Sequence, residues 1–231
     1  MSDAEFDRHA DHYRDVHRSN IAISGELPEY FAAYKMRDFA HIVDVAGSPQ
    51  DGRYLDFGCG IGTSIRPFFA SLPRARLLCA DVSEASLAQA KQEHAYAIEF
   101  APIKDGTLPA ATASLDGAFA CCVFHHIAHT EHLTVLAELR RVLKPGAPLM
   151  IYEHNPYNPL TVRAVKTCPL DENAVLIPAR TMRHRCGHAG FTSVEAQYRV
   201  FFPASLKVLR PLEDRMRWLA LGAQYLVVAR A

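Results

Sequence analysis

A glycine-rich segment and a single acidic residue downstream of it carry the strongest chemical signal in this chain. The segment Leu55–Gly62 reads Leu-Asp-Phe-Gly-Cys-Gly-Ile-Gly, which places a short apolar strand directly before a turn and a helix. Glycines allow a ligand to approach the backbone closely, and the helix N-terminus behind them favours electron-rich groups. Asp81 lies 23 residues beyond Gly58 and ends the next apolar run, where a carboxylate can bind both hydroxyls of a ribose. The pattern predicts a nucleoside site, with a helix N-cap as the other interpretation of Asp81.

The spacing of the glycines separates two kinds of nucleotide site. A dinucleotide fold is expected to carry G-x-G-x-x-G, whereas this chain has G-x-G-x-G with Asp56 two residues before Gly58. A carboxylate at that position would repel a pyrophosphate but would suit a cationic ligand or a water-bridged ammonium group. The spacing therefore favours a positively charged nucleoside over a nicotinamide dinucleotide. Asp56 could also serve the loop itself by accepting hydrogen bonds from its amides.

A second group of candidate residues follows two later apolar runs. His125 and His126 come after the fourth expected strand, and Glu153 and His154 open a Pro-punctuated turn after the fifth. Ligands of parallel sheets bind beyond the carboxyl ends of the strands, so all four are candidate general bases beside the nucleoside. The alternatives are that the histidines pack or cap the loop and that Glu153 forms an ion pair.

The remaining histidines and the cysteines predict no metal site. His125, His129 and His132 have helical spacing, but neither a cysteine nor a carboxylate completes a ligand set. The six cysteines form no C-x-x-C pair, and Cys121-Cys122 lies inside an apolar run. They are therefore expected to be reduced thiols that pack as small apolar side chains.

The elements that must position these residues alternate between apolar strands and amphipathic helices. This alternation predicts a parallel sheet covered on both faces. Near the C-terminus, an alternating segment at 194–202 and an apolar run at 225–229 predict an antiparallel pair that closes the sheet. The earlier strands are expected at 54–57, 75–80, 97–100, 115–124 and 149–152, with helices at 63–71, from Ser83 to His94, and from Thr130 to Leu143.

The N-terminal part of the chain is expected to be helical. Ser2 and Glu5 form a capping-box pattern, after which Tyr13 and His17 share an apolar helical face, so residues 2–18 predict an amphipathic helix. A second helix is expected after Pro28.

With these elements in place, the chain resembles the class I S-adenosylmethionine-dependent methyltransferases. Leu55–Gly62 is similar to the first motif of that family, and Asp81 stands where its ribose-binding acid stands. The further matches follow in family order across about residues 50–155, and they are Leu108-Pro109 with Leu115–Phe119, Phe124–Ile127 and Leu143–Gly146.

The resemblance implies a single α/β domain with a doubly wound, mostly parallel seven-stranded sheet of the Rossmann-like methyltransferase type. It implies an N-terminal helical cap at 1–46, a cofactor-binding core at 47–155, and a C-terminal part at 156–231 that completes the sheet and the acceptor side. Many members carry an acid four residues before the Leu-Pro pair, where this chain has Lys104, with Asp105 one step away.

The implied cofactor is S-adenosyl-L-methionine, with the Tyr-bearing N-terminal helix closing over it. The catalytic candidates remain His125, His126, Glu153 and His154. The residues that would contact the cofactor are Tyr13, Asp56, Gly58, Cys59, Gly60, Gly62, Asp81, Val82, Asp105 and Cys121.

The expected function is methyl transfer to a small-molecule acceptor, a bacterial metabolite or a sugar- or lipid-linked precursor. Lys and Arg total 25, as do Asp and Glu, and this zero net charge speaks against a nucleic-acid acceptor. Neither a membrane span of about 20 apolar residues nor a signal peptide is visible, so a cytoplasmic protein without membrane contact is expected. The alternatives are a non-catalytic protein that binds a nucleoside cofactor and a nicotinamide-dependent oxidoreductase. The sequence predicts no particular oligomeric state.

Overall fold

The computed structural model describes residues 24–94 and 98–231. The helix expected at 2–18, with Tyr13 and His17, lies outside the described residues. Among the described residues, none of the helices is long and apolar enough to cross a membrane.

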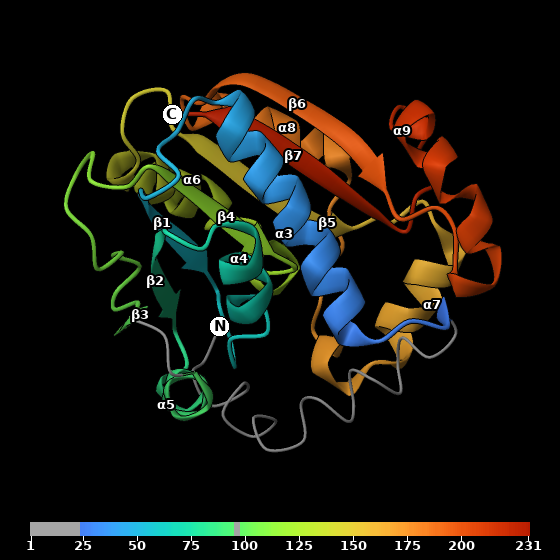
Figure 1. The fold of residues 1–231 in the computed structure, drawn as a ribbon, viewed down its shortest axis with the longest axis horizontal. Coiled ribbons are helices and arrows are strands. Elements are labelled where there is room, and N and C mark those ends of the chain that lie inside the picture. The colour runs from blue at the N-terminus through green and yellow to red at the C-terminus, as the bar shows by residue number, and fades with distance from the viewer. Residues whose placement is uncertain (1–23, 95–97) are drawn as a thin grey trace.

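A seven-stranded sheet forms the centre of the molecule (Figure 1). The strands run in the order β3-β2-β1-β4-β5-β7-β6, and β1 to β5 are mutually parallel. β7 is antiparallel to both of its neighbours, so the closing pair predicted near the C-terminus is confirmed, as is the mostly parallel seven-stranded sheet. The strands are β1 Arg53–Phe57, β2 Arg76–Asp81, β3 Ile98–Pro102, β4 Gly117–Cys121, β5 Pro148–His154, β6 Thr192–Arg199 and β7 Gln224–Arg230.

Helices cover both faces of this sheet, because its central strands are apolar on both sides. On one face, α3 and α4 bury aromatic side chains such as Phe39 and Phe68 against Tyr54 and Phe119. On the other face, α6 and α8 pack Leu136 and other apolar side chains against the strands. The helices are α3 Pro28–Val45, α4 Ile65–Ser71, α5 Glu84–Glu93, α6 His132–Val142, α7 Pro159–Thr167, α8 Ala179–His188 and α9 Glu213–Met216, with 3₁₀ turns η3 Phe124–His126, η4 Pro169–Asp171 and η5 Ala204–Leu212.

The predicted helix starts are partly confirmed. α3 begins at Pro28, and Ser83 caps α5 by accepting a hydrogen bond of 3.0 Å from the backbone N–H of Ser86. Thr130 was expected to cap the next helix, and this is wrong. α6 begins at His132 with Glu131 at the N-cap, and no side chain bonds that helix end.

Two predicted strand ends also need correction, and both lie at the site. The fourth strand stops at Cys121 instead of Phe124, because Cys122 adopts a φ of 60° and η3 starts at Phe124. The fifth strand continues through His154, so Glu153 belongs to the strand and not to the following turn. The reason is the neighbour β7, which pairs with the strand over its whole length up to His154.

The part of the expected N-terminal cap that is described packs on the sheet. Met36, Phe39 and Val43 of α3 are buried in one cluster with residues of β4 and β5. The division at residues 46 and 155 stays a prediction. All six cysteines lie within the described ranges, and each is a free thiol.

Candidate functional site

A cavity of about 1310 Å³ opens at the carboxyl ends of the parallel strands. The last residues of β2, β4 and β5, which are Asp81, Cys121 and His154, all line it. This is the edge at which sheets of this topology bind ligands, because the strand order reverses there and leaves a crevice. The cavity is large enough for a nucleoside and a second molecule beside it.

The glycine loop between β1 and α4 forms one wall of the cavity. The Asp81 carboxylate braces it, because Oδ2 accepts a 2.7 Å hydrogen bond from the N–H of Gly60 while Oδ1 accepts one of 2.9 Å from the N–H of Ser83. Gly60 has a φ of +51°, and a Cβ added there would meet no atom within 4 Å. Its backbone is therefore open to a ligand in the cavity.

The other two glycines of the loop serve packing. A Cβ on Gly58 would lie 2.6 Å from a methyl group of Val123, and one on Gly62 would lie 2.6 Å from the side chain of Ile65. Gly58 still lines the cavity, whereas Gly62 does not. The structure thus places the third glycine, predicted as a cofactor contact, against the following helix.

Asp56 presents a buried carboxylate to the cavity. The residue is 2% exposed, and its Oδ2 has no hydrogen-bond partner among the described residues. Burial raises the pKa of Asp56 well above its ordinary range, the nearby Asp81 raises it further, and Lys35 opposes both. A buried acceptor without a partner fits the amino group of a cationic ligand, which is the character that the sequence predicted for this position.

Four of the other residues predicted to contact the cofactor lie on the cavity wall, and one is not described. Cys59, Val82, Asp105 and Cys121 line the cavity. Tyr13 lies outside the described residues.

Glu153 lies behind the cavity wall and holds His125. Its Oε2 is 2.6 Å from Nδ1 of His125, and its Oε1 accepts hydrogen bonds from the N–H groups of Val123 and Phe124. Glu153 is fully buried and does not line the cavity. Although burial disfavours a charged imidazole, Glu153 and Asp171 raise the pKa of His125 to about 10.

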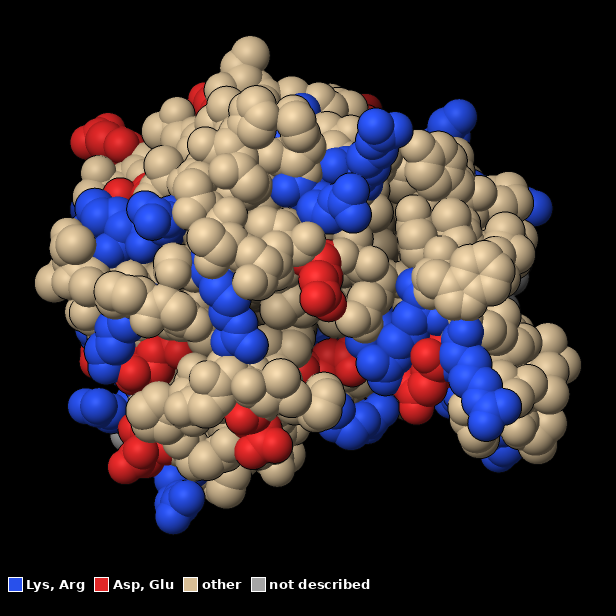
Figure 2. Space-filling model, turned by 90° about the horizontal axis from the view of Figure 1, so that it is seen from above, with Lys and Arg blue, Asp and Glu red and all other residues tan. Residues whose placement is uncertain are grey.

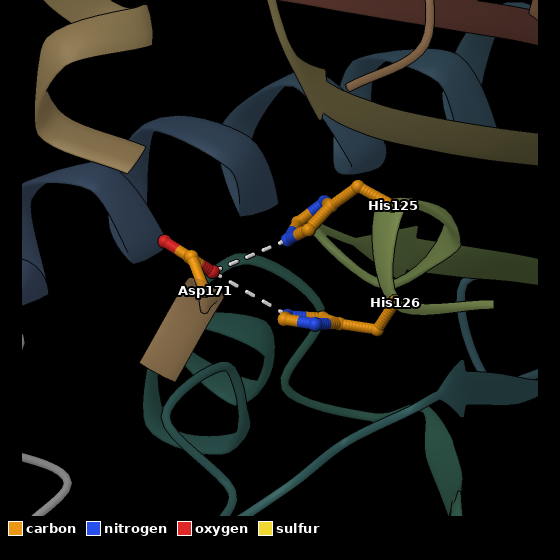
Figure 3. Close-up of side chains that lie close together, drawn as sticks. All are labelled: His125, His126 and Asp171. Carbon is orange, nitrogen blue, oxygen red and sulfur yellow. Dashed lines mark ion pairs between the residues drawn. The ribbon is translucent and has the colours of Figure 1, made fainter. Parts of the chain in front are cut away.

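The three predicted histidines line the cavity, and two of them, His125 and His126, meet an acid from another element (Figure 3). His125 and His126 each place Nε2 at 3.5 Å from Oδ1 of Asp171, which belongs to η4. The ring of His154 lies 5.2 Å from that of His125. Burial and the neighbouring His125 lower the pKa of His126 to about 4.

Sequence reasoning missed Lys35, Cys122 and Asp171, which all line the cavity. Lys35 Nζ lies 3.2 Å from Sγ of Cys122. Burial alone would raise the pKa of that thiol, but Lys35 and His154 lower it to about 6. The sequence offers only weak signals for these residues, because a lysine on an aromatic-rich helix and an acid in a Pro-Leu-Asp turn are usually surface residues.

The outer surface carries charges of both signs. On the face that Figure 2 shows, Lys and Arg side chains are interspersed with Asp and Glu. This agrees with the zero net charge of the whole chain.

Comparison with known proteins finds matches for the central part of the chain. Residues 55–149 match a family described as a methyltransferase domain. The chain is 31% identical over 118 residues to the ubiquinone/menaquinone biosynthesis C-methyltransferase UbiE of Desulfotalea psychrophila, covering 50% of this chain and 46% of that protein. It is 33% identical over 105 residues to the malonyl-[acyl-carrier protein] O-methyltransferase of Hahella chejuensis, covering 45% and 36%. The chain thus spans less than half the length of these curated relatives.

A solved structure shows the same fold over nearly the whole chain. It is a SAM-dependent methyltransferase from Archaeoglobus fulgidus, with a TM-score of 0.67 at 15% identity. The match covers 89% of this chain and 95% of that one.

Proposed function

We propose that this chain, whose residues 55–149 match a methyltransferase-domain family, is a class I S-adenosylmethionine-dependent methyltransferase that transfers a methyl group from S-adenosylmethionine to a small-molecule acceptor. The observation that carries the proposal is the Asp81 carboxylate, which ends β2 and holds the glycine loop at the cavity wall. Each carboxylate oxygen has a second lone pair, so Asp81 can hold the loop and accept hydrogen bonds from a ribose as well.

The residues present suit this cofactor. Asp81 would bind the ribose, Gly60 would let the ligand approach the backbone, and Asp56 would face the amino group. A buried carboxylate oxygen such as Asp56 Oδ2, which has no hydrogen-bond partner among the described residues, is costly to keep, and a cationic ligand offsets that cost. When bound, S-adenosylmethionine supplies a methyl group on a positively charged sulfur.

The remaining work of the chain is positioning and proton transfer. The cavity holds the acceptor in line with the methyl group and keeps water away. The binding energy thereby offsets the entropy cost of orienting the two reactants. His126 and His154 line the cavity and are placed to receive a proton from a hydroxyl acceptor. Glu153 does not face the cavity, so its role is to hold the His125 ring.

A small molecule is the acceptor that the cavity and the net charge favour. A cavity of about 1310 Å³ accommodates the cofactor and a compact second ligand. The zero net charge of the chain provides no overall positive charge that would favour a nucleic acid. The two curated relatives are named for a C-methyltransferase step in quinone biosynthesis and for an O-methyltransferase that acts on malonyl-[acyl-carrier protein]. A cytoplasmic location is part of the proposal.

Calorimetry with S-adenosylmethionine and S-adenosylhomocysteine tests the proposal, with NADH as the comparison ligand. We expect both adenosyl compounds to bind and NADH to give no heat. Turnover is then measured as S-adenosylhomocysteine formed in the presence of fractionated small metabolites. Binding of NADH alone would refute the proposal in favour of an oxidoreductase. Tight binding without turnover in any fraction would favour the non-catalytic alternative.

A further inference from the structure

Three side chains on the cavity wall bring metal-binding atoms together (Figure 3). Nε2 of His125 and Nε2 of His126 each lie 3.5 Å from Oδ1 of Asp171, and the three ligand atoms all lie within 4.8 Å of one another. These separations are longer than ordinary N–H···O hydrogen bonds. Two atoms that are each about 2.1 Å from a tetrahedral zinc ion lie about 3.4 Å apart. The spacing therefore suits ligands of one ion better than direct hydrogen bonds.

The support behind His125 is of the kind that metal-binding histidines require. Glu153 is fully buried and holds Nδ1 of His125 at 2.6 Å, so the other ring nitrogen is directed at Asp171. Glu153 is itself fixed by the backbone N–H groups of Val123 and Phe124. A carboxylate on the far nitrogen of a ligand imidazole orients the ring and strengthens it as a donor. An ion here replaces the proton on Nε2, while the proton on Nδ1 stays on His125 and is donated to the Glu153 carboxylate.

The cluster is enclosed on the protein side and open on the cavity side. The side chains of His125, His126 and Asp171 are 1%, 15% and 13% exposed, and all three line the cavity that Asp81 and Gly60 also line. Three protein ligands leave at least one position of a tetrahedral ion free, which is the arrangement of catalytic zinc sites. That free position can only be filled from the cavity.

We propose that His125, His126 and Asp171 bind a divalent transition-metal ion such as Zn²⁺, and that the open position of the ion takes an oxygen of the methyl acceptor. The second half of this inference rests on the proposed methyl transfer and makes the acceptor a hydroxyl compound. Coordination lowers the pKa of the bound hydroxyl. Because the ion then occupies Nε2 of His126, this ring no longer receives the proton, which leaves to water. The oxygen then forms a bond to the methyl carbon while the bond between that carbon and sulfur breaks, and the electron pair stays on sulfur.

A second pair of histidines must be removed before the site can be tested. His184 and His188 lie one turn apart on α8, both are exposed, and their rings are 4.1 Å apart. Such a pair can bind a divalent ion weakly by itself. The background for all measurements is therefore the His184→Ala/His188→Ala variant, which leaves the cavity intact because neither residue lines it.

The experiment is a titration of this background protein with Co²⁺ and Zn²⁺ after treatment with a chelator. Calorimetry gives the affinity, and the visible spectrum of Co²⁺ reports nitrogen and oxygen ligands independently of any activity. We expect one ion per chain, with affinity at least about 100-fold weaker in H126A and in D171N. Glu153→Gln should weaken it by about 10- to 100-fold, since it loosens the His125 ring. D171N is nearly isosteric, so it serves if H126A does not fold.

The same samples are titrated with S-adenosylhomocysteine, whose binding groups do not include the cluster. Equal affinity in the background protein and in D171N, together with loss of Co²⁺ binding, supports the metal site. Background protein that binds Co²⁺ no more tightly than D171N would overturn it and leave the cluster as an ion-pair network. Loss of S-adenosylhomocysteine binding in every sample would instead refute the proposed function, whatever the metal result.

Discussion

The carboxylate of Asp81 accepts a hydrogen bond of 2.7 Å from the backbone N–H of Gly60, which lies 21 residues earlier in the chain. This bond joins the end of β2 to the glycine loop that follows β1. The two parts of the predicted nucleoside site are thus one unit. A change at Asp81 acts on the ligand directly and also through the shape of the loop.

Asp81→Asn should weaken the binding of S-adenosylhomocysteine by at least about tenfold. The amide keeps the size of the side chain but replaces one acceptor oxygen by an NH₂ group, which cannot accept from both Gly60 and Ser83. Calorimetry measures the effect. The control is Asp51→Asn, because Asp51 is an exposed turn residue that does not line the cavity. Equal affinity in the two variants would refute the assignment of Asp81 to the ribose.

Gly58→Ala and Gly60→Ala should fail in different ways, although both positions have positive φ. A Cβ on Gly58 would press against Val123 at 2.6 Å, so this variant should lose several degrees of thermal stability. A Cβ on Gly60 meets only the cavity, so that variant carries the strain of its positive φ without a clash, and it should stay folded and lose mainly cofactor affinity. Thermal unfolding and calorimetry on both variants test the contrast. A similar loss of stability in both would contradict it.

The fold followed closely from the sequence because its signals are local. The apolar runs at β1, β2 and β5 and the cap at Ser83 each specify their element without reference to distant residues. The error at the end of β5 arose because pairing with a strand distant in the sequence determines where this strand ends. Glu153 looks like a turn residue in sequence, and it lies in β5 because β7 pairs with it.

The sequence predicted the glycine loop, its two acids and the three histidines of the candidate site, but not the acid that two of these histidines meet. Asp56, Gly60 and Asp81 stand in one short, ordered pattern, whereas Asp171 reaches the histidines from a turn 45 residues further along the chain. The helical spacing of His125, His129 and His132, a candidate metal-binding pattern, does not correspond to the cluster in the structure. His132 is engaged elsewhere, since its Nε2 bonds the carbonyl of Ile127 at 3.0 Å.

Asp56→Asn should make the protein more stable and the cofactor weaker bound. Burial, aided by Asp81, raises the pKa of Asp56, so the folded chain holds this proton more tightly than the unfolded chain does. Stability therefore declines as pH rises above the ordinary aspartate value of about 4. Asp56→Asn removes the ionisable group, so the free energy of unfolding of the variant should not show this decline. At neutral pH it should be about 1–2 kcal/mol higher than that of the wild type.

Denaturant unfolding at several pH values, with calorimetry alongside, measures both effects of Asp56→Asn. The gain in stability should be absent at low pH, where the wild-type carboxyl is protonated as well. A variant that is less stable than the wild type at neutral pH would show that Asp56 has a structural partner after all.

Cys122 should react with iodoacetamide faster than the other thiols, with a rate that rises through about pH 6. The cause is Lys35, 3.2 Å from Sγ, together with His154, since both favour the thiolate against the effect of burial. Lys35→Met should move the midpoint to higher pH, and Cys122→Ser should remove the fast reaction. Cys121 is the internal comparison, because burial raises the pKa of its thiol. Mass spectrometry of labelled peptides identifies the site, and a midpoint near pH 8 or above in the wild type would contradict the prediction.

Asp38→Ala should cost about 3 kcal/mol of stability, because it strands a buried cation. The Asp38 carboxylate accepts a 2.8 Å hydrogen bond from Nε of Arg199 and another from the hydroxyl of Tyr152, which ties α3 to β5 and β6. Arg199 is buried, so removing its partner leaves an uncompensated charge. Asp44→Ala, on an exposed position of the same helix, should change stability by less than about 0.5 kcal/mol. The double variant D38A/R199M should recover much of the loss, since it removes the charge with its partner. If the double variant is no more stable than D38A, the loss comes from the Tyr152 hydrogen bond and the packing of α3 instead of from the ion pair.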